Sequence, residues 1–300
     1  MLANTWLVTG AQGFLGANAT LYLQDKVQTV GQVRKASAAR VARTITDNLE
    51  TAANTTNFIT TNQPEVVLHI AALSSHQECE QDPEFAFKVN ADATKKIAQA
   101  CEAAGSQLIY ISTDSVFSGT RGNYSELDNT EPFSSYGESK LQGEIYASQE
   151  TNPLIIRTNF FGWSPNGTRS ILEFFVNNLG AKNQIEGFTN MVTTSLYVTH
   201  ALDYIWQLNQ GNHRGVFHVT SRDALTKYEF GAQVAAEFGL DRQFITPTEQ
   251  PLKRDISLNT SKLALTLNTA VRSQLEGIHQ SHVDNADTGS GRSVRETLQQ

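Results

Sequence analysis

The sequence predicts a doubly wound parallel α/β sheet with a smaller, interwoven C-terminal α+β lobe. Short apolar runs alternate with stretches of helical spacing through the first two thirds of the 300 residues. The run at 66–72 is apolar apart from His69, as expected of a strand buried on both faces of a parallel sheet. Glycines stand where the first strand turns into the first helix. Because parallel strands need right-handed crossovers, this alternation favours the doubly wound architecture.

Each element has its own signal. The first strand, 5–9, is apolar and ends at Gly10, and the helix over 14–23 can place its apolar residues on one side. Pro83 opens a long helix that ends at Ala104, before Gly105. On the same grounds we expect strands at 27–33, 66–72, 108–112 and 154–157, a short strand at Ile45, and helices at 48–61 and 136–149.

After Arg157 the alternation loosens. Helices are expected at 170–178, 198–208 and 227–238, and a strand at 216–219. We assign 1–165 to a dinucleotide-binding domain, to which 190–222 returns, and 166–189 with 223–279 to a substrate lobe. Residues 280–300 are polar and rich in Gly and Ser, which is typical of a mobile tail.

Composition narrows the class of protein. Apolar residues make up 39% of the chain, enough for a sizeable core. The 23 basic and 30 acidic residues give a net charge of −7, which argues against nucleic acid or an anionic membrane as partner. Two cysteines without CxxC spacing, no signal peptide and no long apolar run indicate a cytoplasmic protein. Seven histidines without an HExxH pattern predict no metal site.

The glycine run predicts a dinucleotide site. Gly10, Gly13 and Gly16 follow a strand and open a helix, with the spacing Gly-x-x-Gly-x-x-Gly. Such glycines allow a tight turn and bring backbone N–H groups and a helix N-terminus close to a pyrophosphate. A purely structural turn is the alternative.

The end of the second strand bears on which dinucleotide is bound. NAD sites usually place a carboxylate there, to accept a hydrogen bond from the ribose 2′-hydroxyl. Here Arg34 and Lys35 occupy that place, and such cations suit a 2′-phosphate. NADP(H) is therefore favoured, with NAD(H) and a pair of solvated surface cations as alternatives.

Tyr136 and Lys140 are four residues apart on an expected helix and so share one face. A phenol is a weak acid near neutrality, and a cation beside it is expected to lower its pKa. Tyr22 and Lys26 have the same spacing, but Tyr22 is expected in the core. Position favours Tyr136, because its helix follows a strand whose carboxyl end borders the cofactor crevice of such sheets.

That strand ends in Ser112, Thr113 and Asp114, which are well placed for a ligand. A hydroxyl there could hydrogen-bond a reacting oxygen, and a carboxylate could orient a sugar hydroxyl. The alternative is that these side chains only cap their own turn.

These segments together resemble the extended short-chain dehydrogenase/reductases, which have a Rossmann fold. The resemblance rests on the glycine turn, Ala71-Ala72, Val89-Asn90, Ser112-Thr113-Asp114-x-Val116-Phe117-x-Gly119 and Tyr136-x-x-x-Lys140. The Ser-Thr-Asp segment is most similar to that of the dTDP-4-dehydrorhamnose reductases. The likeness is strong over about 5–160 and thinner to about 265.

The resemblance implies a role for each matching position. The cofactor would be bound by Gly10, Gly13, Phe14, Leu15, Gly16, Arg34, Lys35, Asp47, Asn48, Ala71, Ala72, Asn90, Tyr136 and Lys140. The catalytic residues would be Thr113, Asp114, Tyr136 and Lys140, and the substrate would be bound by Ser74, Ser75, Thr113 and Asn159.

The implied function is NADPH-dependent reduction of a nucleotide-linked 4-keto-6-deoxy sugar in carbohydrate biosynthesis. A sugar-nucleotide epimerase or dehydratase and a non-catalytic NADP-binding regulatory subunit are the alternatives, and a homodimer is left open. The segments 157–163 and 187–194 depart from the family pattern, in which both help to form the sugar-nucleotide site. The chemistry therefore transfers better than the substrate.

Overall fold

The computed structural model describes residues 2–35, 43–286 and 294–299. The chain forms two compact units and passes repeatedly between them. The first unit comprises Met1–Phe117, Thr130–Arg157 and Asn209–Phe217, and the second comprises Ser118–Asn129, Thr158–Leu208 and His218–Gln300.

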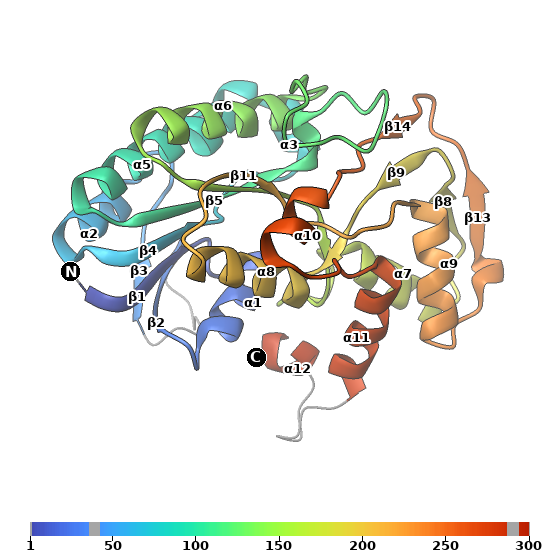
Figure 1. The fold of residues 1–300 in the computed structure, drawn as a ribbon. Coiled ribbons are helices and arrows are strands. Elements are labelled where there is room, and N and C mark those ends of the chain that lie inside the picture. The colour runs from blue at the N-terminus through green and yellow to red at the C-terminus, as the bar shows by residue number, and fades with distance from the viewer. Residues whose placement is uncertain (1, 36–42, 287–293, 300) are drawn as a thin grey trace. The chain divides into compact units, whose positions relative to one another are not determined.

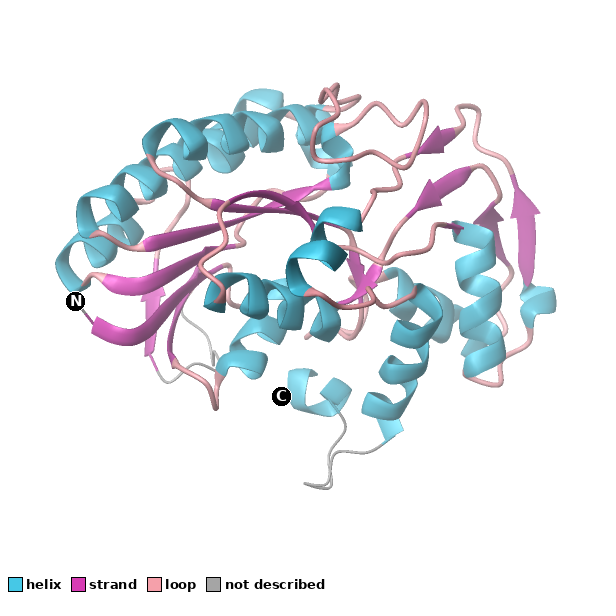
Figure 2. Cartoon of the chain, viewed as in Figure 1, coloured by secondary structure: helices cyan, strands magenta, loops and turns pink. Residues whose placement is uncertain are grey.

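The first unit is built on a seven-stranded sheet with the order β11-β6-β5-β4-β1-β2-β3 (Figures 1 and 2). Its strands are β1 (Leu2–Thr9), β2 (Gln28–Val33), β3 (Arg43–Thr46), β4 (Pro64–His69), β5 (Gln107–Thr113), β6 (Leu154–Thr158) and β11 (Gly215–His218). The strand β1 pairs in parallel with both β2 and β4, and the pairs β2–β3 and β4–β5 are also parallel. This confirms the doubly wound sheet. The strand order reverses between β1 and β4, where such sheets bind ligands at their carboxyl ends.

Helices cover this sheet from two sides. They are α1 (Phe14–Leu23), α2 (Ala53–Asn62), α3 (His76–Gln81), α4 (Pro83–Phe87), α5 (Ala93–Ala104) and α6 (Ser135–Glu150), with a short π-helix η1 (Lys88–Asp92) and a 3₁₀ turn η2 (Asp114–Val116). In Figure 1 α2, α5 and α6 lie along one face and α1 lies on the other. A core of fully buried residues, including Leu7, Val67 and Ile97, joins the sheet to α5.

The long helix expected at 83–104 contains an irregularity. Asp82 caps its start by accepting the Phe85 N–H, and Gly105 ends it with φ +68°. Between these ends, η1 inserts a turn of π-helix around Asn90. Such turns frequently occur at functional sites.

The second unit is a smaller mixture of helices and short strands. Its elements are β7 (Phe160–Phe161), α7 (Ile171–Gly180), β8 (Ile185–Phe188), β9 (Met191–Thr193), β10 (Leu196–Tyr197), α8 (Val198–Gln210, whose last residues belong to the first unit), β12 (Leu225–Thr226), α9 (Lys227–Glu237), η3 (Arg242–Phe244), β13 (Ile245–Thr248), β14 (Arg254–Asp255), α10 (Ser261–Leu267), α11 (Gln274–Ala286) and α12 (Val294–Gln299). Aromatic rings fill its core: Phe161 lies 5.0 Å from Phe230 and 5.9 Å from Tyr197, measured between ring centroids.

The expected tail begins inside a helix. The Trp163 indole donates to the backbone carbonyl of Ser281 at 2.9 Å, and Ser281 is buried on α11. Residues 287–293 of the expected tail lie outside the described residues. Within the described ranges, no helix has the length and apolar character that a bilayer crossing requires.

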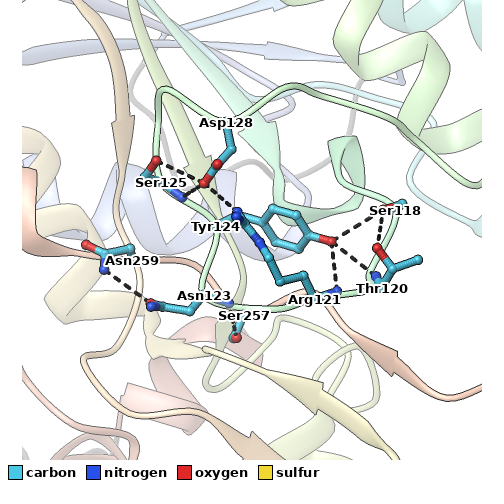
Figure 3. A network of polar contacts seen from close by, with 9 residues as sticks. All are labelled: Ser118, Thr120, Arg121, Asn123, Tyr124, Ser125, Asp128, Ser257 and Asn259. Carbon is cyan, nitrogen blue, oxygen red and sulfur yellow. Dashed lines mark hydrogen bonds and ion pairs between the residues drawn. The ribbon is translucent and has the colours of Figure 1, made fainter.

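The loop 118–129, which links β5 to the segment before α6, is organised around Tyr124 (Figure 3). The Tyr124 hydroxyl accepts the backbone N–H groups of Thr120 and Arg121 at 3.1 and 3.2 Å. Asn123 N–H donates to the Ser257 hydroxyl at 2.8 Å. The loop is thereby fixed within the second unit.

Candidate active site

The glycine turn after β1 leaves no room for side chains at two of its positions. Gly10 has φ +68°, which favours glycine, and the Gly13 N–H donates to the Gly10 carbonyl at 2.8 Å. A Cβ added at Gly16 would lie 2.0 Å from the Gly10 carbonyl oxygen. The turn leads directly into α1, in which Phe14 is the first residue and Leu15 is buried.

A glutamine that the sequence analysis missed fixes this turn. Gln32 is buried on β2, where its Oε1 accepts the Gly10 N–H at 2.9 Å. Its Nε2 donates to the backbone carbonyl of Asp47 at 2.9 Å. One side chain therefore holds the first turn and the end of β3 in register. The available signal was a polar residue between Gly31 and Val33, at the buried end of the strand.

The residues expected to meet the adenosine half of the cofactor differ in their surroundings. Arg34 and Lys35 are exposed just beyond β2. Asp47 is buried, and its carboxylate accepts the backbone N–H and the hydroxyl of Thr55 at 2.7 and 2.6 Å. That carboxylate is thus committed to α2, whereas Asn48 lies exposed beside it.

A continuous set of contacts joins the glycine turn to α6. A Cβ at Gly10 would lie 3.0 Å from the Ala71 Cα, so the turn and the loop after β4 touch. Two residues on, Leu73 donates its N–H to the Asn90 Oδ1 at 2.7 Å and accepts from the Asn90 Nδ2 at 3.0 Å. The Asn90 Nδ2 also reaches the hydroxyl of Ser139, on α6, at 2.9 Å. The turn of π-helix therefore positions the Asn90 side-chain amide between two segments. This amide links the loop after β4, which contains Ala72, to α6, the helix that carries Tyr136 and Lys140.

A neutral histidine lies beneath this region. The Thr9 hydroxyl oxygen accepts the N–H groups of Ile70 and Ala71, so its proton is directed to the His69 Nδ1 at 2.8 Å. The His69 Nε2 then donates to the Thr94 hydroxyl at 3.0 Å. Burial lowers the pKa of His69 to about 3, and the charge of Lys140 acts in the same direction. His69 is therefore an uncharged link between β1 and α5.

Thr113, Asp114 and Tyr136 meet at the carboxyl end of β5. The Thr113 hydroxyl donates to the Asp114 Oδ1 at 3.1 Å, accepts the Ser115 N–H at 3.1 Å, and is hydrogen-bonded to the Tyr136 hydroxyl. Thr113 therefore caps its own turn, as the alternative interpretation held, and also contacts the phenol. Only β4 separates β5 from β1, which puts the two strand ends roughly 10 Å apart.

Lys140 lies one turn of α6 beyond Tyr136, as expected. It is buried, and its Nζ stands 4.1 Å from the centroid of the Tyr110 ring. Burial lowers the pKa of Lys140 to about 7, while the charge of Glu144 opposes that shift. A buried amine with a pKa near neutrality is typical of functional sites.

Burial has the largest effect on the pKa of the Tyr136 phenol. The pKa of Tyr136 is raised above its ordinary value, first by burial and then by the charge of Asp114, while the hydrogen bond from Thr113 opposes the rise. The expectation that the cation lowers this pKa was wrong, because loss of water around the phenol is the largest cause of its shift and raises it.

The Tyr22/Lys26 pair differs from the pair on α6. Tyr22 is only partly buried, contrary to our expectation of a core residue, and the Lys26 Nζ lies 4.3 Å above its ring. The two pairs share their spacing but not their surroundings, so Tyr22 offers a matched control for Tyr136.

Three residues expected to bind substrate have separate settings. Ser74 is exposed, and Ser75 caps α3 by accepting the Glu78 N–H at 3.2 Å. Asn159, in the second unit, accepts the Ser195 hydroxyl at 2.7 Å. The sequence analysis missed His76, whose ring centroid lies 4.7 Å from that of Tyr136. No group of three or more His, Cys, Asp or Glu residues suited to a metal occurs in the described ranges.

Comparison with known proteins gives matches over nearly the whole chain. The model of the family described as the RmlD substrate binding domain matches residues 4–282. A probable low-salt glycan biosynthesis reductase of Haloferax volcanii is 29% identical over 245 residues, covering 79% of this chain and 81% of the relative. The methionine adenosyltransferase 2 subunit beta of Pongo abelii is 29% identical over 274 residues, covering 86% and 80%.

The crystal structure of a dTDP-4-dehydrorhamnose reductase of Bacillus anthracis, in complex with NADP, has the same fold. Its TM-score is 0.83 at 21% identity, and the match covers 94% of this chain and 99% of that one. The expected architecture is therefore confirmed by a solved structure.

Proposed function

Because the chain belongs to the family described as the RmlD substrate binding domain, we propose that it is an NADPH-dependent reductase of a nucleotide-linked 4-keto-6-deoxy sugar. One observation carries this proposal: the hydroxyl of Tyr136 is hydrogen-bonded to Thr113 beside the buried Lys140, at the same sheet edge as the glycine turn. A phenol, a hydroxyl and an amine at that edge suit proton transfer to a carbonyl oxygen.

The glycine turn fits a dinucleotide. A Cβ at Gly16 would meet the Gly10 carbonyl oxygen, so α1 starts in direct contact with the turn, and the N-terminus of such a helix suits a pyrophosphate. Exposed Arg34 and Lys35 suit a 2′-phosphate better than a bare 2′-hydroxyl, which favours NADP(H) over NAD(H). When bound, NADPH would supply the hydride that reduces the carbonyl carbon.

The residues of the chain would handle the proton and the oxygen. Tyr136 donates its phenolic proton to the substrate oxygen as that oxygen gains negative charge. Thr113 would turn its single hydroxyl proton to the same oxygen as charge develops there, and its hydrogen bond with Tyr136 opposes the rise in the pKa of the phenol. Without substrate that proton is donated to Asp114, which holds the Thr113 side chain in place. Lys140 would bind the nicotinamide ribose and place a cation beside the phenol.

A non-catalytic regulatory subunit is the second candidate. The likeness to the methionine adenosyltransferase 2 subunit beta favours it, since that protein is described as a subunit. A sugar-nucleotide epimerase or dehydratase is the third, and it would turn over without net consumption of NADPH. The arrangement of Tyr136 with Thr113 and Lys140 supports an enzyme over a binding subunit.

The test follows NADPH absorbance with a panel of keto-sugar nucleotides. Tyr136→Phe should lower turnover by roughly 10²- to 10⁴-fold, the usual worth of general acid catalysis, with cofactor affinity retained. Tyr22→Phe, the matched control, should behave as the parent. Tight NADP binding without turnover of any carbonyl would favour the regulatory subunit, and conversion without NADPH loss would favour the epimerase.

We also propose that the protein acts in the cytoplasm. Both cysteines, Cys79 and Cys101, are buried free thiols, which suits a reducing compartment.

The sequence left a homodimer open. Light scattering of the purified protein distinguishes a monomer from a homodimer.

A further inference from the structure

A buried charged cluster lies directly behind Lys140, and the proposed chemistry leaves it unused. Glu144 follows Lys140 by four residues on α6, so Tyr136, Lys140 and Glu144 form one stripe along the helix. The Glu144 carboxylate receives the Arg157 guanidinium at 2.7 Å from Nη2 and 3.0 Å from Nε, and the Ser112 hydroxyl at 2.5 Å. The side chains of Glu144 and Arg157 are each only 6% exposed.

A buried ion pair is by itself weak evidence of a stabilising role. Replacing a buried ion pair with apolar residues of similar size is often neutral or stabilising, because removing two charges from water is costly. The Arg157 guanidinium lies over the Phe117 ring, 5.2 Å from its centroid, which fixes its position beside Glu144. Within the described part of the chain its Nη1 has no hydrogen-bond partner, so its hydrogen bonds go to the Glu144 carboxylate. The carboxylate is thus fixed in place from β5 and β6.

Lys140 has few other sources of charge stabilisation. Its ammonium faces Tyr110 on β5, His69 on β4, and Tyr136 and Glu144 on its own helix. His69 is neutral at pH 7 and both phenols keep their protons. Asp114, on η2, acts on Tyr136. Glu144 is the carboxylate whose charge acts on Lys140, and Arg157 is the cation that competes for it.

We propose that Glu144 is a positioning residue for the Tyr136/Lys140 pair, and that Arg157 and Ser112 orient its carboxylate so that it holds Lys140 in the charged form. This role rests on the proposed function, because a charged Lys140 is what would bind the nicotinamide ribose and support the phenolate. The spacing of four from Tyr136 through Lys140 to Glu144 was visible in the sequence.

Glu144 and Arg157 should have opposite effects on the pH at which Lys140 loses its proton. Removing the carboxylate in Glu144→Gln leaves two buried cations, so Lys140 should lose its proton at lower pH. Removing the guanidinium in Arg157→Met leaves the carboxylate to Lys140 alone, so Lys140 should lose its proton at higher pH. A residue that only stabilised the fold would not give shifts of opposite sign.

The experiment titrates the Lys140 Nζ by NMR in the full-length protein with ¹⁵N-labelled lysine. The resonance is assigned by its loss in Lys140→Arg. We expect Glu144→Gln to lower the midpoint by about one pH unit and Arg157→Met to raise it. Glu138→Gln removes an exposed charge from the same helix and should leave the midpoint unchanged.

If a single substitution prevents folding, the double variant Glu144→Gln/Arg157→Met removes both charges together. Its midpoint should lie below that of the parent and above that of Glu144→Gln, where the latter folds. An unchanged midpoint in the double variant, or shifts of the same sign in the two singles, would overturn the proposal.

The pH–rate profile gives a second readout. If Glu144→Gln lowers the midpoint of the Lys140 titration from about 7 to about 6, the fraction of molecules with a charged Lys140 at pH 7.5 falls roughly eightfold. Turnover at that pH should fall by a similar factor. If the parent turns over no keto-sugar nucleotide, the proposed function fails, while the NMR titration still decides the role of Glu144.

Discussion

Gly16→Ala should weaken both the binding of the cofactor and the stability of the fold. The added Cβ would lie 2.0 Å from the Gly10 carbonyl oxygen and 2.9 Å from the Ala11 Cα, and both are backbone atoms. A tolerable contact is at least about 3.0 Å, so the turn must open by about 1 Å. A shift of that size would displace the N-terminus of α1, where we propose that the pyrophosphate binds. A hydrogen bond to a charged group is worth about 1.5–3 kcal/mol, so the Kd for NADP should rise roughly 10- to 150-fold.

The assay pairs a fluorescence titration with NADPH and a thermal melt. Gly180→Ala is the matched control: nothing lies within 4 Å of its Cβ, and it ends α7 in the second unit. Alanine there should stabilise the protein by about 0.4–1 kcal/mol and leave the affinity unchanged. Overpacking at Gly16 should itself cost about 1–3 kcal/mol of unfolding free energy.

If Gly16→Ala binds NADPH as tightly as the parent, the turn does not hold the pyrophosphate, and the steric argument fails with it. If it loses stability and keeps its affinity, the turn is a purely structural element, which was the alternative that the sequence left open.

Three further predictions follow from named contacts. Arg34→Asp should shift the preference from NADPH toward NADH in steady-state kinetics, because a carboxylate repels the 2′-phosphate; a parent that already prefers NADH would contradict the assignment. Thr113→Val removes the hydrogen bond that lowers the pKa of Tyr136, so turnover should fall about tenfold or more with NADPH affinity unchanged; an equal loss of cofactor binding would instead point to local unfolding. His69 is neutral when folded, with a pKa of about 3, and takes up a proton when unfolded below about pH 6.5, so its contribution to stability is lost as the pH falls from 6.5 toward 3. Denaturant unfolding at pH 5 should show this loss as about 2 kcal/mol in the parent, and His69→Gln should lack this dependence on pH.

Most of the fold was predictable because apolar periodicity is a local signal. The helix expected at 14–23 is α1, residue for residue, and the strands before and after it shift by only a few positions. The turn of π-helix at Asn90 could not be predicted from the sequence, because it depends on hydrogen bonds from the Asn90 amide to the loop after β4 and to α6. Periodicity cannot report a contact between segments far apart in the chain.

The candidate site divides in the same way. The positions of Gly10, Tyr136 and Lys140 follow from spacing and element order. The buried partners do not: Gln32 and Glu144 have roles set by which polar atoms meet in three dimensions. The electrostatic expectation failed for a related reason, since the pKa of Tyr136 depends on burial that spacing alone does not reveal.

The alternation of the chain between its two units constrains how the polypeptide can be made. The boundaries follow Phe117, Asn129, Arg157, Leu208 and Phe217, so neither unit is a continuous stretch of sequence. During translation the seven-stranded sheet cannot be completed until β11 has left the ribosome. Until then β6 pairs with β5 on one side and is an open edge on the other. A nascent chain that stalls before residue 209 would expose that edge to other molecules, and a gene fragment that ends there should yield aggregates.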